Sequence, residues 1–586
     1  MKKELRENIA RFSKIIVIIS SLLGIASIIV EYGFRIKSSD AGTLHFITIG
    51  VIIVFILYHI LQLYIAEDKV AHIKSHKFEM IIISFIFIEG LLSFFNLSLV
   101  ERIGAALKLK DITYLYIVFA QIFIVVGIIS GTLRYNIKLL QSQIHPSRLF
   151  IFSFLFTIIV GTFALMLPAA TVEGKISFVD ALFTSTSAVC VTGLITVDTA
   201  TYFTTFGKMT IMALFQIGGL GLMTFTTFFA IFLSGGLGIK ERILLHDLLE
   251  EENIGAITKV LTYLLAITFI IEAVGAAILF YSSRNSFDSI ENAAFISIFH
   301  SVSAFCNAGF SLFTMNLMDP AVRYNHVFTT TISILIILGG LGFPTIISFL
   351  KFKNITSKMG KLSIKLPLQT RIVVVSTILL IVFGAASFYF LEQHNTLKNL
   401  NLFEKLNASY FQSVTARTAG FNTIDFGLIT TPTAVLFFLL MFIGASPGGT
   451  GGGVKTTTFA LLFYGSIAIL KNKKEVYIYN RAIPNEIIIK ALIKAGLSIF
   501  FITFGIFLLT ITERADLTKV AFEAFSAFGT VGLSMGLTQE LTWGGKIIVV
   551  LLMFIGRVGP LAFLYTFMSG AKEDYYELPH ENISIL

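Results

Sequence analysis

The sequence is poor in charged residues. Of its 586 residues, 13% are charged and 55% are hydrophobic, and the mean hydropathy is +0.85. Average soluble domains carry about 25% charged residues, and no long polar stretch is present that would form one. This shortage of charge argues against a soluble protein and indicates a chain that faces lipid.

Cysteine is scarce too. Cys190 and Cys306 do not make a disulfide framework, and we expect both to pack as small buried hydrophobic residues. Residues 1–14 are basic, but the apolar run that follows lacks the small-residue cleavage site of a signal peptide.

Several classes of protein are disfavoured by what is missing. The formal net charge is +9, but the basic residues lie in short loops between apolar runs, where the rule for membrane orientation explains them. Nucleic-acid-binding proteins instead gather basic residues on one face or tail, so we expect no nucleic-acid partner. The histidines are scattered and no paired intramembrane carboxylates occur, which argues against an enzyme.

Long apolar runs dominate the chain. A bilayer core of about 30 Å needs roughly 20 apolar residues in a helix. Twelve spans are predicted on that criterion: 15–33, 44–65, 79–100, 112–133, 149–168, 208–233, 258–281, 327–350, 371–391, 433–443 continuing to 456–470, 488–511 and 546–569. The basic N-terminus, the basic loops 351–371 and 471–481, and the tail predict a multi-pass protein of the cell (inner) membrane with both termini cytoplasmic. The loop 101–111 is an exception, because it carries basic residues on the outer side.

Four shorter segments are too short or too polar to cross the membrane, and each ends in a motif that contains glycine. The segments lie near 178–190, 291–304, 404–416 and 518–528. The glycines are Gly193, Gly309, Gly420 and Gly532, spaced 116, 111 and 112 residues apart. An aromatic residue stands ten positions before each one, and the next apolar span carries its own glycine: Gly218, Gly339, Gly444 or Gly556. Routine helix packing would explain single glycines, but it does not predict a half-helix in all four units.

The physics of such a unit is specific. Irregular backbone at membrane depth must line a cavity or be buried in protein, and glycine accepts the backbone angles that turn carbonyls inward. Four such loops around one axis form rings of carbonyl oxygens that can replace the hydration shell of a monovalent cation. The half-helices would aim their negative ends at the same axis.

The predicted fold is therefore an all-α polytopic membrane protein with four span–pore-helix–span repeats in pseudo-fourfold symmetry around one pore. The repeats are expected at 149–235, 256–350, 368–470 and 486–570, after four extra N-terminal transmembrane helices of unknown role in 1–148 and before a cytoplasmic tail at 571–586. The backbone carbonyls expected to hold the ion are those of Val191, Thr192, Gly193, Asn307, Ala308, Gly309, Thr418, Ala419, Gly420, Thr530, Val531 and Gly532.

The run 444–458, Gly-Ala-Ser-Pro-Gly-Gly-Thr-Gly-Gly-Gly-Val-Lys-Thr-Thr-Thr, resembles the intramembrane loop of the TrkH/KtrB (Trk/Ktr/HKT) superfamily of potassium-uptake proteins. The motifs 417–423 and 554–560 match it as well, and the resemblance covers about 149–570. It implies K⁺ as the transported ion, a homodimeric membrane subunit, and a cytoplasmic nucleotide-binding regulatory ring of the TrkA/KtrA type that alone holds the nucleotide. Relatives with serine in the first filter loop favour sodium, so Gly193 indicates potassium. The four spans before the repeats depart from the pattern.

Six glycines and one proline within 444–453 cannot stay helical. Just below a filter, this break suits a gate made of Gly444, Ser446, Pro447, Gly448, Gly449, Thr450, Gly451, Gly452, Gly453, Lys455 and Arg557. A phosphate-binding loop is the alternative, but the spacing does not fit its template. A charge inside a span costs at least about 2.5 kcal/mol, so we expect Arg557 across the pore from the loop; a structural ion pair is the alternative.

Other polar residues near the repeats have less specific roles. We expect Arg417 behind its loop as a brace, and Lys455 bonded to loop carbonyls. His300 is expected to be structural rather than a proton relay. The carboxylates of Asp180, Glu272, Glu291 and Glu523 either attract cations or serve as buried hydrogen-bond partners.

The function predicted from the sequence is inward K⁺ conduction through this filter, driven by the membrane potential at about 2.3 kcal/mol per charge per 100 mV. A Na⁺-coupled or proton-coupled cation symporter and a sodium-selective member of the same superfamily stay open as alternatives. A receptor or structural membrane protein would not need four repeated loops.

Overall fold

The computed structural model describes residues 146–221, 257–355, 366–473 and 475–566, together with scattered helical positions between 12 and 84. Among those positions is the apolar helix Ile56–Ile65. The rest of the predicted N-terminal region 1–148 and the predicted tail 571–586 lie outside the described residues.

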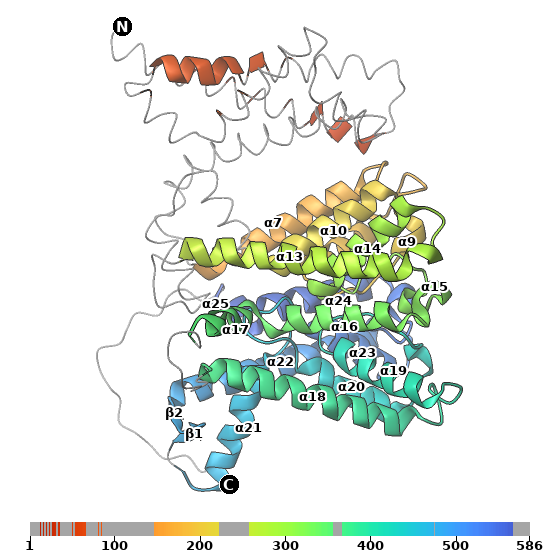
Figure 1. The fold of residues 1–586 in the computed structure, drawn as a ribbon, viewed down its shortest axis with the longest axis vertical. Coiled ribbons are helices and arrows are strands. Elements are labelled where there is room, and N and C mark those ends of the chain that lie inside the picture. Colours follow the sequence, from red (N-terminus) through yellow and green to blue (C-terminus); the bar gives the residue numbers. More distant parts are fainter. Residues whose placement is uncertain are drawn as a thin grey trace.

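One order of elements recurs four times along the described chain: a long helix, a short helix and a second apolar helix (Figure 1). The long helices are α7 (Pro146–Met166), α13 (Ile257–Ser283), α18 (Leu368–Glu392) and α22 (Asn485–Thr512). The short helices are α8 (Phe178–Val189), α14 (Ile290–Phe305), α19 (Leu402–Thr415) and α23 (Leu517–Gly529). The second apolar helices are α10 (Thr205–Leu220), α16 (His326–Leu341), α20 (Thr431–Phe442) and α24 (Trp543–Val558). The four half-helices predicted from the sequence are therefore present.

Further helices and turns lie between these helices or follow the last of them. They are α9 (Thr199–Tyr202), α15 (Pro320–Arg323), α17 (Phe343–Ile355), α21 (Thr456–Leu470) and α25 (Pro560–Tyr565), with 3₁₀ turns at Arg284–Ser286, Asn316–Met318, Phe426–Leu428 and Thr538–Glu540.

Polar caps start three of the four short helices. Ser177 accepts a hydrogen bond from the Asp180 amide at the start of α8, and Ser289 accepts one from the Asn292 amide at the start of α14. Asn401 and Glu404 form a reciprocal capping box at the start of α19. Such caps satisfy amides that have no partner within the helix, so these helices can begin where the chain turns away from a long apolar run.

A glycine in each long helix lets the three helices of a unit meet closely. A Cβ added at Gly161, Gly275, Gly384 or Gly505 would lie 2.7–3.0 Å from a leucine methyl group of the second apolar helix of the same unit: Leu214, Leu335, Leu440 or Leu552. In three units a serine hydroxyl of the short helix also donates to a carbonyl of the long helix. Those bonds are Ser185 to Ile158 at 2.7 Å, Ser301 to Glu272 at 2.7 Å and Ser413 to Ile381 at 2.8 Å. One packing scheme thus serves all four units, with the hydroxyl bond in three of them.

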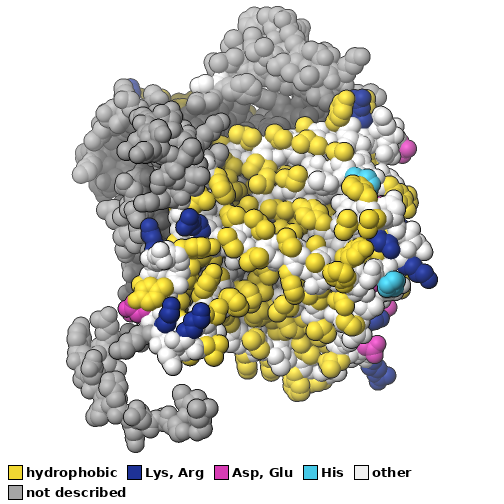
Figure 2. Space-filling view, turned by 60° about the horizontal axis from the view of Figure 1, so that its bottom comes forward, with side chains coloured by type: hydrophobic (Ala, Val, Ile, Leu, Met, Phe, Trp, Pro, Cys, Tyr) yellow, Lys and Arg dark blue, Asp and Glu magenta, His cyan; other side chains and the backbone are white. Residues whose placement is uncertain are grey.

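The outward faces of the long helices are apolar. Figure 2 shows hydrophobic side chains covering the broad middle of one face, with charged side chains gathered toward its ends. Phe269, Leu379 and Phe500 are more than half exposed, and three described helices, Thr262–Ser286, Leu368–Glu392 and Asn485–Thr512, are long and apolar enough to cross a membrane. Such a band is the surface that a lipid-embedded protein presents.

The structure corrects two expectations. The spans predicted at 327–350 and 546–569 are not continuous helices, because Gly342 and Gly559 adopt φ of +85° and +92° and interrupt them. The axis bends by 99° between α16 and the start of α17. The fold is helical as predicted, but the described residues also include a strand pair that was not expected: Val476–Ile478 (β1) and Arg481–Ile483 (β2) pair as an antiparallel hairpin that follows α21 (Figure 1). Strands of three residues are too short for the apolar-run criterion that identifies membrane spans to detect them.

Candidate ion pathway

The four glycines predicted from the repeat meet one another in a closed order. A Cβ added at Gly193 would lie 3.0 Å from the Cα of Gly309, and one at Gly309 would lie 3.0 Å from that of Gly420. From Gly420 to Gly532 the distance is 3.2 Å, and from Gly532 back to Gly193 it is 3.1 Å. Segments more than 300 residues apart in the sequence therefore meet around one small space, and their four glycines form a ring about it (the glycine ring).

The carbonyl before each glycine faces the neighbouring segment. The Ala308 oxygen lies 2.5 Å from a Cβ placed on Gly193, the Ala419 oxygen 2.8 Å from one on Gly309, and the Val531 oxygen 2.7 Å from one on Gly420; the Thr192 oxygen overlaps one on Gly532. A side chain at any of these glycines would collide with a carbonyl that cannot move without its loop. The positions require glycine because of this close approach.

The backbone of all four segments alternates in handedness. The glycines have φ between +71° and +91°. Two residues earlier, Val191, Asn307, Thr418 and Thr530 have φ between +51° and +72°, an uncommon conformation for side chains of this kind. Alternation of positive and negative φ turns successive carbonyls toward the same side, whereas an extended strand points them to opposite sides. Strain of this kind gathers where surrounding structure enforces it.

A hydroxyl from the last part of each short helix supports the glycine segment. Ser187 and Ser526 accept the amide N–H groups of Gly193 and Gly532 at 3.0 and 3.1 Å. In the other two units the hydroxyl donates instead: Ser303 to the Phe310 carbonyl at 2.8 Å and Thr415 to the Phe421 carbonyl at 2.6 Å. Sequence reasoning missed these residues, although a serine or threonine five or six positions before each glycine was a visible signal.

In three units, a second polar side chain of the short helix bonds a residue two or three positions after the glycine. His300 Nε2 lies 3.0 Å from the Ser311 hydroxyl, and its Nδ1 lies 2.8 Å from the Ile296 carbonyl. Gln412 donates to Thr423 at 2.9 Å, and Glu523 accepts from Ser534 at 2.8 Å and from Thr538. These contacts fit the structural role expected for His300 and the buried-partner role weighed for Glu523.

The loop between α20 and α21 is held by its own backbone and by the second unit. Gly444 N–H donates to the Val454 carbonyl at 2.9 Å. Ser446 and Thr450 N–H groups donate to the carbonyls of Gly340 and Gly339 at 3.0 and 3.2 Å. The N–H of Phe343 bonds the Gly448 carbonyl at 3.1 Å. The loop is therefore docked on the point where α16 breaks.

The same loop reaches the glycine segments from one side. Gly452 N–H donates to the Thr530 hydroxyl at 2.8 Å, and a Cβ on Gly451 would overlap the Thr418 hydroxyl. The Asn307 amide group lies 3.2 Å from the same Thr418 hydroxyl. Glycines at 451 and 452 let the loop backbone pack directly against these side chains.

Arg557 joins three units at the level of this loop. It lies in the last turn of α24 and donates to the carbonyls of Thr450 in the loop and Gly218 in α10. Thr450 also donates through its hydroxyl to the Phe305 carbonyl at 3.2 Å. The Lys455 ammonium donates to the Gly451 carbonyl at 2.7 Å, the type of contact expected for it. Among the described residues, both side chains thus donate to backbone carbonyl oxygens rather than to carboxylates.

The remaining predicted residues lie apart from the glycine ring. Arg417 is buried and its Nε has no hydrogen-bond partner among the described residues, so no bracing bond is seen from that atom. Asp180 pairs with Lys546 at 2.7 Å, which ties the start of α8 to the start of α24. Glu291 is exposed on the first turn of α14, and Glu272 is buried between α10 and α14.

Asp180 lies in the first turn of the non-spanning helix α8. Burial opposes its ionisation, but hydrogen bonds from Lys546 and Ser177 outweigh burial and hold the pKa of Asp180 below its ordinary value.

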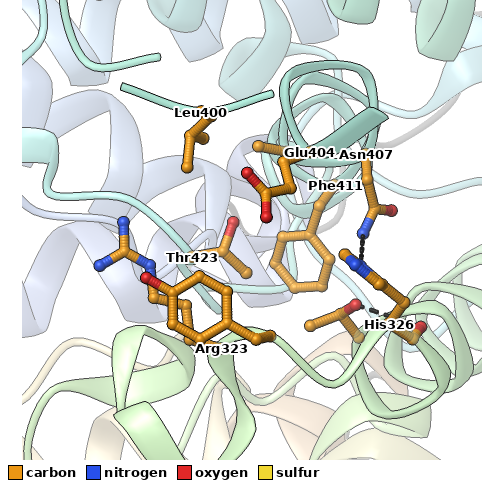
Figure 3. Close-up of a pocket in the computed structure, with 10 residues that line it drawn as sticks. Arg323, His326, Leu400, Glu404, Asn407, Phe411 and Thr423 are labelled. Carbon is orange, nitrogen blue, oxygen red and sulfur yellow. Dashed lines mark hydrogen bonds between the residues drawn. The ribbon is translucent and has the colours of Figure 1, made fainter. Parts of the chain in front are cut away.

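A small cavity of about 40 Å³ lies where α15 and α16 meet α19 (Figure 3). His326 Nδ1 is 3.1 Å from the Asn407 amide nitrogen across this joint, and the His326 ring packs edge-on against Phe403 at 5.0 Å. Arg323 and Glu404 line the same cavity without forming a salt bridge with each other in the described structure. The cavity marks the joint between the second and third units rather than the glycine ring.

Comparisons with known proteins agree with this architecture. Residues 116–576 match the TrkH family of cation transport proteins. The Ktr system potassium uptake protein B of Bacillus subtilis is 43% identical over 72% of this chain and 93% of its own length. The protein of the same name from Vibrio alginolyticus is 38% identical over 71% and 90%.

Potassium/sodium uptake protein NtpJ of Enterococcus hirae is 36% identical over 76% of this chain and 99% of its own length. The crystal structure of the potassium transporter TrkH from Vibrio parahaemolyticus superposes with a TM-score of 0.59 at 16% identity, covering 82% of this chain and 97% of that one, a likeness of fold. Family membership, relatives matched over nearly their whole length and an apolar helical body indicate a membrane transport protein. The chain belongs to the TrkH family of cation transport proteins.

Proposed function

We propose that this protein takes up K⁺ across the cell membrane through a single pore surrounded by its four helical units in pseudo-fourfold symmetry. The units correspond to the repeats at 149–235, 256–350, 368–470 and 486–570, and the filter is formed by the carbonyls of 191–193, 307–309, 418–420 and 530–532. Carbonyl oxygens replace the water around the ion, so that a desolvated K⁺ is held at membrane depth.

The observation that carries the proposal is the closed order of the four glycines, with the carbonyl before each one directed at its neighbour. A residue other than glycine held at positive φ costs about 1–3 kcal/mol, and each segment holds one such residue: Val191, Asn307, Thr418 or Thr530. This strained conformation occurs in all four segments, and a hydroxyl from a short helix holds each one in place. Simple helix packing does not explain why four segments would share it. A ring of carbonyls with a function in ion binding accounts for them.

The gate in this proposal is the loop from Gly444 to Lys455, with Arg557 opposite. The loop lies against Thr418 and Thr530 of two filter segments, and Arg557 holds its Thr450 carbonyl. A positive charge beside the pathway opposes cations, so the closed state has both a steric and an electrostatic barrier. Opening requires that the loop leave Arg557 and the carbonyls of α16.

A nucleotide-binding regulatory ring on the cytoplasmic face supplies the force for that motion, and two copies of the chain form a homodimer in the inner membrane with both termini in the cytoplasm. The Ktr system potassium uptake proteins of Bacillus subtilis and Vibrio alginolyticus are each named as a component of a system, which supports a partner subunit. The nucleotide belongs to that partner.

The test is growth rescue of a potassium-uptake-deficient host at low K⁺, with the regulatory subunit co-expressed. Wild type should rescue, and Gly420→Ser should fail because its side chain enters the ring. Both proteins are quantified in the membrane fraction, so that a loss of function is separated from a loss of protein. No rescue by well-expressed wild type would remove the proposal.

Sodium transport is the second candidate, since one relative is named a potassium/sodium uptake protein. Uptake of each ion by the purified protein in liposomes at fixed membrane potential separates the candidates. Faster Na⁺ uptake would favour a sodium-selective protein, and K⁺ uptake that stops when Na⁺ or a proton gradient is removed would favour a symporter.

A further inference from the structure

Glu272 lies within the long helix α13 and is 4% exposed. Its Oε2 accepts a hydrogen bond from Gln216 Nε2 of α10 at 3.1 Å. The thiol of Cys306, just after α14, donates to Gln216 Oε1 at 3.2 Å and lies 3.9 Å from Glu272 Oε1. Three side chains from three helices therefore form a closed ring at the joint between the first and second units.

No basic side chain forms an ion pair with Glu272 among the described residues; Arg557 of α24, which reaches α10 at Gly218, donates to carbonyl oxygens instead. The titratable residues on the helices packed against it are Lys208 of α10, Lys259, Tyr263 and Tyr281 of α13, Glu291 and His300 of α14, and His326 of α16. His300 is engaged with Ser311, and His326 with Asn407. A buried carboxylate without a partner is strongly disfavoured within the membrane, so the carboxyl group requires a ligand that carries positive charge.

The ring fits a proton better than a metal ion. With the proton on Oε1, the carboxylic acid donates to Cys306 Sγ, the thiol donates to Gln216 Oε1, and the amide donates back to Oε2. Each group then donates once and accepts once, which matches its hydrogen-bonding capacity. A hard metal ion would need several oxygen ligands, whereas Gln216 turns its N–H toward the carboxyl group.

The hydrogen-bonded ring of Glu272, Gln216 and Cys306 lies next to the Gly218 carbonyl that Arg557 binds. Cys306 Sγ is 2.6 Å from where a Cβ of Gly219 would be, and the adjacent Gly218 carbonyl accepts from Arg557, which also holds Thr450. We propose that Glu272, with Gln216 and Cys306, is a proton-binding site that controls the gate. Protonated, the site is neutral and Arg557 stays on the loop; when the carboxylic O–H releases its proton to water, the new negative charge draws Arg557 away from Thr450.

This inference rests on the gating role proposed for Arg557, and a flux experiment tests it. Rubidium uptake into K⁺-loaded liposomes is measured as a function of pH for the reconstituted protein. Wild-type uptake should rise with pH by about fivefold or more, the lower end of measured couplings between sites. Glu272→Gln keeps the ring but cannot ionise, so its uptake should stay at the low-pH level. Glu291→Gln, the same change at an exposed position of α14, should keep the wild-type rise.

Measurable wild-type uptake that does not change with pH, or a rise that persists in Glu272→Gln, would overturn the inference. Infrared difference spectra between low and high pH give a readout that does not depend on transport. Wild type should lose the carbonyl absorption of protonated carboxylic acids as pH rises, and one component of that loss should be missing in Glu272→Gln while the components from the other carboxyl groups remain. A titrating band without K⁺ flux at any pH would leave the proton site standing and refute the transport proposal instead.

Cys306→Ala provides a second variant in case Glu272→Gln does not fold. It removes the acceptor of the acid O–H, so the infrared titration should move to lower pH. An unchanged titration would show that the thiol is not part of the site, and it would refute the proposed proton site made of Glu272, Gln216 and Cys306.

Discussion

Gly532 packs directly against the carbonyl of Thr192, so that the last helical unit closes onto the first. The two residues belong to segments at opposite ends of the described chain. Among the described residues, this contact joins the two glycine segments that lie farthest apart in the sequence. It completes the set of four contacts that link each segment to the next. A covalent chain thereby reproduces a closed ring that separate subunits would otherwise have to build.

A side chain at a ring glycine should abolish selective uptake. Gly420→Ala puts a Cβ 2.7 Å from the Val531 oxygen at a φ of +75°, and strain of this kind costs about 1–3 kcal/mol. We expect rubidium uptake to fall to background or to lose its preference over sodium.

Gly496→Ala is the matched control, because nothing lies within 4 Å of a Cβ at that exposed position of α22. It should keep wild-type uptake and be more stable by about 0.5–1 kcal/mol. Equal uptake by the two variants would contradict the role of the ring.

Loss of a serine or threonine hydroxyl that bonds a glycine segment should change ion selectivity more than the amount of protein in the membrane. Ser526→Ala leaves the Gly532 N–H without its partner, and a buried donor left unpaired costs about 1–3 kcal/mol. We expect a lower ratio of K⁺ to Na⁺ uptake. Ser466→Ala removes a hydroxyl that bonds only its own helix, to Leu462 at 2.9 Å on the exposed side of α21, and should change neither ratio nor stability. A Ser526→Ala protein with an unaltered ratio would argue against the support.

Removal of the Arg557 charge should raise flux. Arg557→Ala frees the carbonyls of Thr450 and Gly218 and removes the electrostatic barrier. Without the regulatory subunit, uptake should increase severalfold over wild type, measured in liposomes. Arg481→Ala, at an exposed position of the hairpin, should leave uptake unchanged. Lower uptake by folded Arg557→Ala protein would show that the arginine assists conduction.

The Asp180–Lys546 pair should make stability depend on acid. The folded-state pKa of Asp180 is below its ordinary value of 3.8, so the stabilisation is fully present above that value. It disappears as the pH falls through the lower, folded-state pKa. The side chains are 18% and 17% exposed, and partly exposed pairs contribute about 0–1 kcal/mol.

Thermal unfolding in detergent from pH 7 to pH 3 measures this effect. Asp180→Asn should be less stable than wild type at pH 7, and the difference should shrink toward pH 3. A difference that stays constant over this range would assign the loss to packing rather than to the charge.

Local patterns in the sequence located much of the fold. The half-helices, the glycines of the ring and the break at 444–453 each depend on residues within one turn or loop, such as the run of glycine in 444–453. The breaks at Gly342 and Gly559 escaped prediction because a single glycine within an apolar run is common in membrane helices. The hairpin Val476–Ile483 escaped because it lies between spans.

The sequence by itself indicated a membrane protein with long apolar runs and a glycine motif that recurs four times, since hydropathy and spacing are properties of the linear order. Only the tertiary structure decided which atoms meet: that Thr192 closes onto Gly532, that Arg557 binds carbonyls rather than a carboxylate, and that Glu272 shares a ring with Gln216 and Cys306. These contacts join residues from separate helices, and their geometry depends on how whole helices pack, which no local pattern of residues encodes.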